Sequence, residues 1–106
     1  MQQEITGTHV TDDNGNPAGG RTIGKGITID WQNGPLAVDG VRKDPNGAFV
    51  EGVILAALDR LRYYQAGKWA CRENALAITK LEESLHWLQH RTANREARGV
   101  EGTHKA

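Results

Sequence analysis

The stretch PNGAFVEGVILAALDRLRYYQ, residues 45–65, decides much of the fold of this chain. Its apolar residues recur at helical spacing after Pro45, which indicates an amphipathic helix with Asn46 as an acceptable N-cap. The members of this apolar stripe are Val50, Val53, Ile54, Ala57, Leu58 and Leu61. Gly67 then ends the helix, because glycine is a poor helix former and favours turns.

A second helical stretch follows directly, CRENALAITKLEESLHWLQHRT, residues 71–92. Its stripe consists of Ala75, Ile78, Leu81, Leu85 and Leu88. We expect this helix to begin near Trp69 or Cys71 and to end near Ala97, where Gly99 suits a left-handed C-cap. Two amphipathic helices joined by a short turn make an antiparallel hairpin, here residues 46–98. Both stripes are longer than one partner helix and a small sheet can cover, so we expect self-association as a symmetric dimer.

The first 45 residues have a different character, with all three prolines of the chain and several glycine-containing turn signals. Those turn signals are Asp12–Pro17, Gly19–Gly20 and Asn33–Pro35. Apolar and polar residues alternate from Ile27 to Trp31, which predicts a half-buried strand. Ile5–Val10 and Leu36–Val41 are weaker strand candidates. The prediction is an α+β fold in one domain, residues 1–106, with a small N-terminal antiparallel sheet packed on a long two-helix hairpin.

Composition excludes several function classes. The 106 residues carry 13 basic and 13 acidic side chains, and this balance argues against charge-driven binding to DNA, RNA or membranes. The sequence opens with no secretory signal pattern and has no apolar run of membrane-spanning length. The lone Cys71 fits a reducing compartment, and its phase in the helix predicts a buried thiol. We therefore expect a soluble cytoplasmic protein.

The C-terminal residues are rich in groups that bind phosphate. Arg91, Arg95 and Arg98 recur at spacings of three and four, so they share one helical face. The polar, glycine-spaced loop Gly99–His104 follows them. Guanidinium groups and open backbone N–H groups suit a phosphorylated small molecule. The alternative is a frayed, solubilising terminus, which is the commoner fate of a chain end.

The segment Gly20–Gly26 resembles a phosphate loop in composition, but a strand follows it where such loops precede a helix. Two interpretations stay open: a plain turn, and a hairpin tip that presents Arg21 and Lys25 to a ligand.

Glu82, His86 and His90 recur every four residues and so share a helix face, as metal ligands do. Solvated side chains are the commoner outcome of such a pattern, and we expect no metal and no catalytic residue.

Aromatic residues gather around the predicted hairpin turn and the second helix, at Tyr63, Tyr64, Trp69 and Trp87. Packing in a core or an interface explains most of them. Tyr64 and Asn74 flank the turn, however, so a stacking ring and a side-chain amide could meet in one pocket.

The order of these segments, a glycine-rich β region, the two helical stretches and finally REARGVEGTH, residues 95–104, resembles the phage Thoeris anti-defence proteins of the first-described type. Their helical hairpin is shared with phage anti-CBASS sponges. The resemblance implies a homodimer, in some relatives a homohexamer, that sequesters cyclic ADP-ribose isomers without cleaving them in the infected bacterial host. Some hexameric relatives also hold cyclic di- or trinucleotides at separate sites.

The same resemblance implies roles for particular residues. Tyr64 matches the base-stacking position, Asn74 a ligand-contacting amide, and Arg91 a phosphate-binding arginine, while Arg21 is a less certain match for a second arginine. The segment Arg98–His104 would close over the pocket. The remaining candidate ligand contacts are Thr92, Arg95, Arg98, Gly99, Val100, Gly102, Thr103 and His104.

The resemblance implies neither a cofactor nor an enzymatic activity. Two alternatives remain open. One is a small phage structural or adaptor protein that oligomerises through its hairpin. The other is a metal-dependent phosphodiesterase that uses Glu82, His86 and His90.

Overall fold

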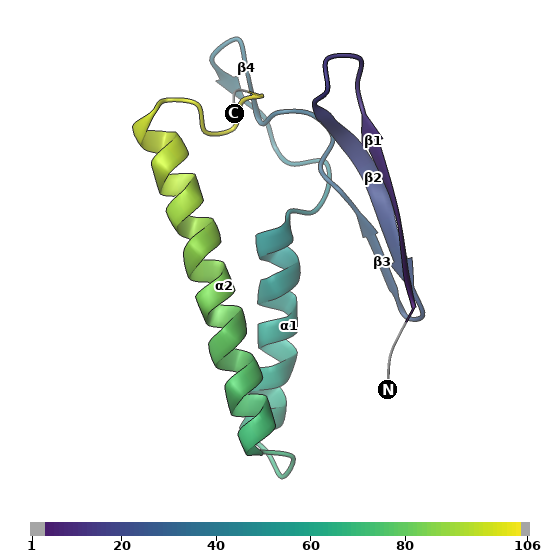
Figure 1. Ribbon diagram of the computed structural model, residues 1–106, viewed down its shortest axis with the longest axis vertical. Helices are drawn as coiled ribbons and strands as arrows, with labels where there is room; N and C mark the ends of the chain where they lie inside the picture. The colour runs from purple at the N-terminus through teal and green to yellow at the C-terminus, as the bar shows by residue number, and fades with distance from the viewer. Residues whose placement is uncertain (1–3, 105–106) are drawn as a thin grey trace. The chain divides into compact units, whose positions relative to one another are not determined.

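The computed structural model describes residues 4–104 and divides into two compact units. One unit holds the described residues up to Phe49 together with the segment from Val100, and the other is Val50–Gly99. Figure 1 shows strands in the first unit and two long helices in the second. The predicted α+β class, with its N-terminal antiparallel sheet, is confirmed. That the chain forms a single domain stays a prediction.

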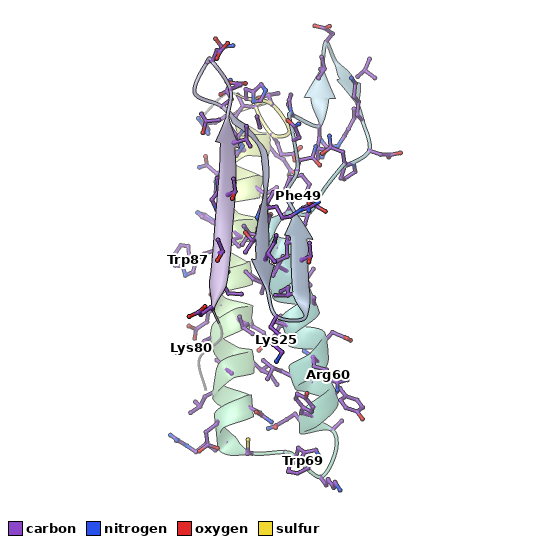
Figure 2. The ribbon with its side chains drawn as sticks, turned by 90° about the vertical axis from the view of Figure 1, so that its right-hand side faces the viewer. Lys25, Phe49, Arg60, Trp69, Lys80 and Trp87 are labelled. Carbon is purple, nitrogen blue, oxygen red and sulfur yellow. The ribbon has the colours of Figure 1, made fainter. Side chains whose placement is uncertain are left out.

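The sheet of the first unit has three antiparallel strands in the order β1-β2-β3. They are β1 (Ile5–Thr11), β2 (Pro17–Gly24) and β3 (Ile27–Asp30). The carboxylate of Asp12 shapes the first turn by accepting hydrogen bonds from the backbone N–H groups of Asn14 and Asn16, at 2.9 and 3.0 Å. Lys25 and Gly26 make the second turn, which Figure 2 shows with Lys25 labelled.

Strand β2 differs from the expected turn at Gly19–Gly20 and decides where Arg21 and Lys25 lie. Gly19 and Gly20 lie inside the strand and not in a turn, and Arg21 belongs to the strand while Lys25 alone stands at the hairpin tip. Gly20 has φ 135°, and a Cβ there would lie 2.2 Å from the carbonyl oxygen of Thr8. Glycine is therefore needed for the close approach of β1 at the irregularity between His9 and Thr11. The sequence pattern indicated that Gly19 and Gly20 are flexible, but it did not indicate that β1 would lie beside them.

A second, two-stranded sheet replaces the single strand expected at Leu36–Val41. It consists of β4 (Ala37–Val38) and β5 (Val41–Arg42). Asp39 and Gly40 form the connection with φ values of 51° and 76°. Two successive positive φ angles are typical of the type I′ turn, for which Asp-Gly is a preferred pair.

The first helix begins later than the sequence indicates. Asn46 does not cap it, because its side chain bonds the backbone N–H and carbonyl of Asn33 at 2.8 and 2.9 Å. Ala48 pairs in extended form beside Trp31, and its N–H donates to the carbonyl of Asp30 at 2.8 Å. Helix α1 therefore spans Val50–Gln65. Pairing between distant segments has overridden the local capping preference.

The second unit is the predicted helical hairpin, α1 followed by α2 (Arg72–Ala97), with the helices antiparallel in Figure 1. Arg62 of α1 and Glu82 of α2 form an ion pair at 3.1 Å. In the described part of the chain Leu58 is the one side chain with no exposed surface, and α2 contributes no buried residue. Gly99 has φ 71°, which confirms the left-handed residue expected after α2.

Candidate functional site

The turn between the helices carries a hollow of about 270 Å³ with aromatic walls. Its lining residues are Tyr63, Tyr64, Ala66, Gly67, Lys68 and Trp69. The ammonium group of Lys68 lies 5.5 Å from the centre of the Trp69 ring. Figure 2 shows Trp69 at this end of the hairpin. Aromatic rings beside a cation suit a planar, negatively charged ligand such as a nucleotide.

Hydrogen bonds between side chains and backbone hold this turn in shape. The side-chain amide of Gln65 both donates to the carbonyl of Cys71 and accepts from its N–H, at 3.0 and 3.1 Å. Asn74, one of the predicted ligand contacts, donates from Nδ2 to the carbonyl of Trp69 at 3.1 Å. The structure thus places Tyr64 and Asn74 at the same end of the hairpin. Asn74 keeps its carboxamide oxygen as an acceptor while its nitrogen fixes the turn.

Cys71 departs from the expected burial. Its thiol is exposed, and its sulfur accepts a hydrogen bond from the backbone N–H of Asn74 at 3.4 Å. Cys71 is therefore the N-cap of α2. The N-cap has an extended backbone, with φ −158° and ψ 165°, and so lies outside the helix. The helical periodicity that predicted a buried thiol therefore does not describe Cys71.

Arg60 joins the aromatic group and was missed by the sequence analysis. Its guanidinium carbon lies 4.7 Å from the centre of the Tyr63 ring and 4.9 Å from that of Tyr64. Its Nε donates to the Tyr64 hydroxyl at 3.1 Å. This hydrogen bond is the main reason why the pKa of Arg60 is raised. The spacings of three and four residues to the two tyrosines were a sequence signal for this cluster.

The predicted phosphate-binding residues lie in the last third of α2. Arg91 is exposed there and Arg95 is half-buried. The Thr92 hydroxyl donates to the carbonyl of Leu88 at 3.2 Å, so its proton is used within the helix. Arg98 is the C-cap of α2.

Within one hairpin these arginines do not meet the aromatic hollow. Asn74 and Arg91 stand on the same straight helix, about 25 Å apart at 1.5 Å per residue. Helix α2 therefore carries the amide at one end and the guanidinium groups at the other.

The remaining candidate residues belong to the first unit. Arg21 lies opposite Asp30 in the sheet, and its Nε donates to that carboxylate at 2.6 Å. Both side chains are more than half exposed, at 56% and 60%. Solvent therefore screens the pair, and Arg21 can exchange Asp30 for another anion at low cost.

The C-terminal segment Val100–His104 is held by β4 and β5. Glu101 forms a two-pronged ion pair with Arg42, at 2.7 and 3.2 Å. The N–H of Ala37 donates to the carbonyl of Gly102 at 2.9 Å. Thr103 bonds the carbonyl of Val100 with both its N–H and its hydroxyl. The segment that carries Gly102, Thr103 and His104 is therefore anchored to a particular sheet edge.

His86 and His90 flank Trp87 on α2, each with its ring centre 5.9 Å from the indole in an edge-on arrangement. Glu82 is engaged by Arg62. Between residues 4 and 104, no group of three His, Cys, Asp or Glu side chains is placed to hold a metal ion. Trp87, labelled in Figure 2, is 67% exposed.

Comparison with known proteins agrees with the hairpin geometry. Residues 24–93 match the family model described as Acb2/Tad1, hairpin domain. The chain belongs to the Acb2/Tad1 hairpin family. A curated relative in Bacillus phage SBSphiJ7, Thoeris anti-defense 1, is 51% identical over 82 residues. The resemblance to phage Thoeris anti-defence proteins is thereby confirmed.

The family match covers the end of β2, all of α1 and most of α2, so it includes Tyr64, Asn74 and Arg91. The alignment with the Bacillus phage relative takes in 77% of this chain and 55% of that relative, so the chain spans about half the length of the curated protein. In the part of the chain that the structure describes, neither helix has the length and apolar character needed to cross a membrane.

Proposed function

We propose that this protein binds and sequesters cyclic nucleotide immune signals, in particular cyclic ADP-ribose isomers made by TIR-domain proteins, without degrading them. Its role would be to protect a phage in the bacterial host. Membership of the Acb2/Tad1 hairpin family and the anti-defence relative support this assignment. Cyclic di- and trinucleotides are further ligands to test.

The observation that carries the proposal is the distribution of groups along the hairpin. An aromatic hollow with Tyr64 stands at the turn, and Arg91 lies about 25 Å from Asn74 along α2. A second hairpin running antiparallel to the first would bring the arginines of one protomer to the aromatic rings of its partner. The poorly buried helices support such pairing, because α2 leaves its apolar stripe without a buried residue.

The pocket formed by Tyr64 of one protomer and the arginines of its partner suits a cyclic nucleotide that contains a pyrophosphate group. A purine would stack on Tyr64, which contributes about 1–3 kcal/mol per base in comparable sites. Charge-assisted hydrogen bonds from guanidinium groups to phosphate contribute about 1.5–3 kcal/mol each. Together these terms can reach nanomolar affinity. The roles of Arg21 and of Val100–His104 remain predictions that require substitutions of their own.

Isothermal titration against a panel of cyclic ADP-ribose isomers and cyclic di- and trinucleotides tests the proposal. We expect at least one isomer to bind, and heating the complex should release it chemically intact by mass spectrometry. A hydrolysed product would indicate an enzyme, and EDTA-sensitive turnover would indicate the metal-dependent phosphodiesterase. Absence of any binding or thermal shift would favour a structural or adaptor protein.

Arg91→Ala provides the residue-level test. We expect about 10- to 150-fold weaker binding, the loss of one charge-assisted contact, while light scattering shows the dimer unchanged. Lys80→Ala is the matched control, since Lys80 is an exposed cation of the same helix and pairs with Glu83, at 3.6 Å. Equal affinities of Arg91→Ala and Lys80→Ala would remove Arg91 from the site.

A further inference from the structure

Arg60 stands beside the aromatic hollow without lining it. Its guanidinium lies against the rings of Tyr63 and Tyr64, and its Nε bonds the Tyr64 hydroxyl at 3.1 Å. Tyr64 is among the residues that line the hollow, and Arg60 is not. Figure 2 shows Arg60 on α1 near the turn that carries Trp69. Arg60 therefore touches the hollow through two of its lining residues, Tyr63 and Tyr64, and it forms its hydrogen bond with Tyr64.

The three side chains restrain one another. The Tyr63 and Tyr64 rings are 5.7 Å apart and tilted by 56°, and the guanidinium contacts both. A tyrosine ring on a helix surface is otherwise free to change its χ1 rotamer. Here the hydroxyl is anchored to a residue one helical turn away, so a change of χ1 breaks the hydrogen bond and one cation–π contact together. Arg60 thereby limits the orientations open to the Tyr64 ring.

We propose that Arg60 is a positioning residue for ligand binding, which holds the Tyr64 ring in its stacking orientation before the ligand arrives. The inference rests on the proposed function, in which a purine stacks on Tyr64. A side chain that is already immobilised loses less conformational entropy when the ligand binds. This preorganisation raises the affinity for the ligand. A phenylalanine at position 64 would stack equally well but would lack the hydrogen bond from Arg60 that fixes the ring. The hydroxyl of Tyr64 therefore acts in orientation and need not touch the ligand.

A double-variant cycle tests the coupling. The probe is the cyclic ADP-ribose isomer that binds the native protein most tightly. Arg60→Met and Tyr64→Phe should each weaken binding about three- to tenfold, the usual cost of ordering one side chain on binding. The double variant should be no weaker than the worse single variant, because both changes remove the same hydrogen bond. Lys80→Met, which removes an exposed cation of α2 that pairs with Glu83, should bind as the native protein does.

The salt dependence separates positioning from direct contact with phosphate. If Arg60 acts through Tyr64, raising the ionic strength should weaken the native protein and Arg60→Met by the same factor. Multiplicative losses in the double variant, or a shallower salt dependence for Arg60→Met, would overturn the positioning role and assign Arg60 to the ligand itself.

A spectroscopic measurement on the ligand-free protein completes the test. The Arg60 Nε–H signal in a ¹H–¹⁵N spectrum should be visible and slowed in solvent exchange, and Tyr64→Phe should abolish that protection. Unprotected Nε–H in the native protein would overturn the inference even if ligands bind. If the native protein binds no cyclic nucleotide, the proposed function fails and the binding role of Arg60 fails with it. If the native protein binds a cyclic nucleotide but the two substitutions act independently, the positioning role of Arg60 fails while the proposed function stands.

Discussion

Replacing Gly20 by alanine probes the closest backbone approach in the sheet. The new Cβ would lie 2.2 Å from the carbonyl oxygen of Thr8 and 3.0 Å from the Cα of His9. Real Cβ atoms essentially never come within 3.0 Å of such an atom, so β1 and β2 would have to move apart by about 0.8 Å. Both neighbours are backbone atoms, so no flexible side chain can absorb the change.

Gly20→Ala should lower the free energy of unfolding for two reasons. The backbone conformation of Gly20, at φ 135°, disfavours any side chain by about 1–2 kcal/mol. Separation of the strands weakens two or three ladder hydrogen bonds, which contribute about 1 kcal/mol each. Gly20→Ala should therefore destabilise the sheet by about 3–5 kcal/mol, a large fraction of the stability of a small unit.

Gly15→Ala is a matched control. Gly15 also has a positive φ, 81°, but an added Cβ meets nothing within 4 Å, so only the backbone part of about 1–2 kcal/mol applies. Trp31 is the natural probe, because its indole N–H donates to the Thr22 hydroxyl in the same sheet at 2.7 Å. Urea unfolding followed by Trp31 fluorescence, with Trp69 and Trp87 replaced by phenylalanine, measures both variants. A difference between them below about 0.5 kcal/mol would refute the steric argument.

Two further substitutions test contacts that the sequence did not predict. Arg42→Met removes the ion pair with Glu101, so protection of the Ala37 amide, which donates to Gly102, should fall about fivefold in hydrogen exchange. Arg42→Lys should give an intermediate value, and unchanged protection in Arg42→Met would show that the ion pair does not anchor the segment. Cys71→Ser should stabilise α2 by about 0.5–1 kcal/mol, because a hydroxyl is a stronger N-cap acceptor than a thiol. Thermal unfolding by circular dichroism should rank Ser above Cys and Cys above Ala at position 71, and any other order contradicts the cap.

The candidate site was open to sequence reasoning only in part. Tyr64 and Asn74 flank a short turn, so chain connectivity alone brings them near each other. Arg60 was overlooked although its spacing to Tyr63 and Tyr64 is local and therefore readable. The anchoring of Gly102 by Ala37 was not readable, because it joins segments more than sixty residues apart.

The amino-acid sequence by itself determined the helical hairpin, its turn and the left-handed Gly99, because helical periodicity and capping act between residues a few positions apart. Only the tertiary structure decided that Gly20 belongs to a strand, where the backbone of Thr8 approaches it, and that α1 begins at Val50. Ala48 pairs beside Trp31 in extended form, and that contact with a distant segment overrides the helix start that the local sequence favours. Local chemistry fixes the helices, whereas strand pairing depends on which backbone comes alongside.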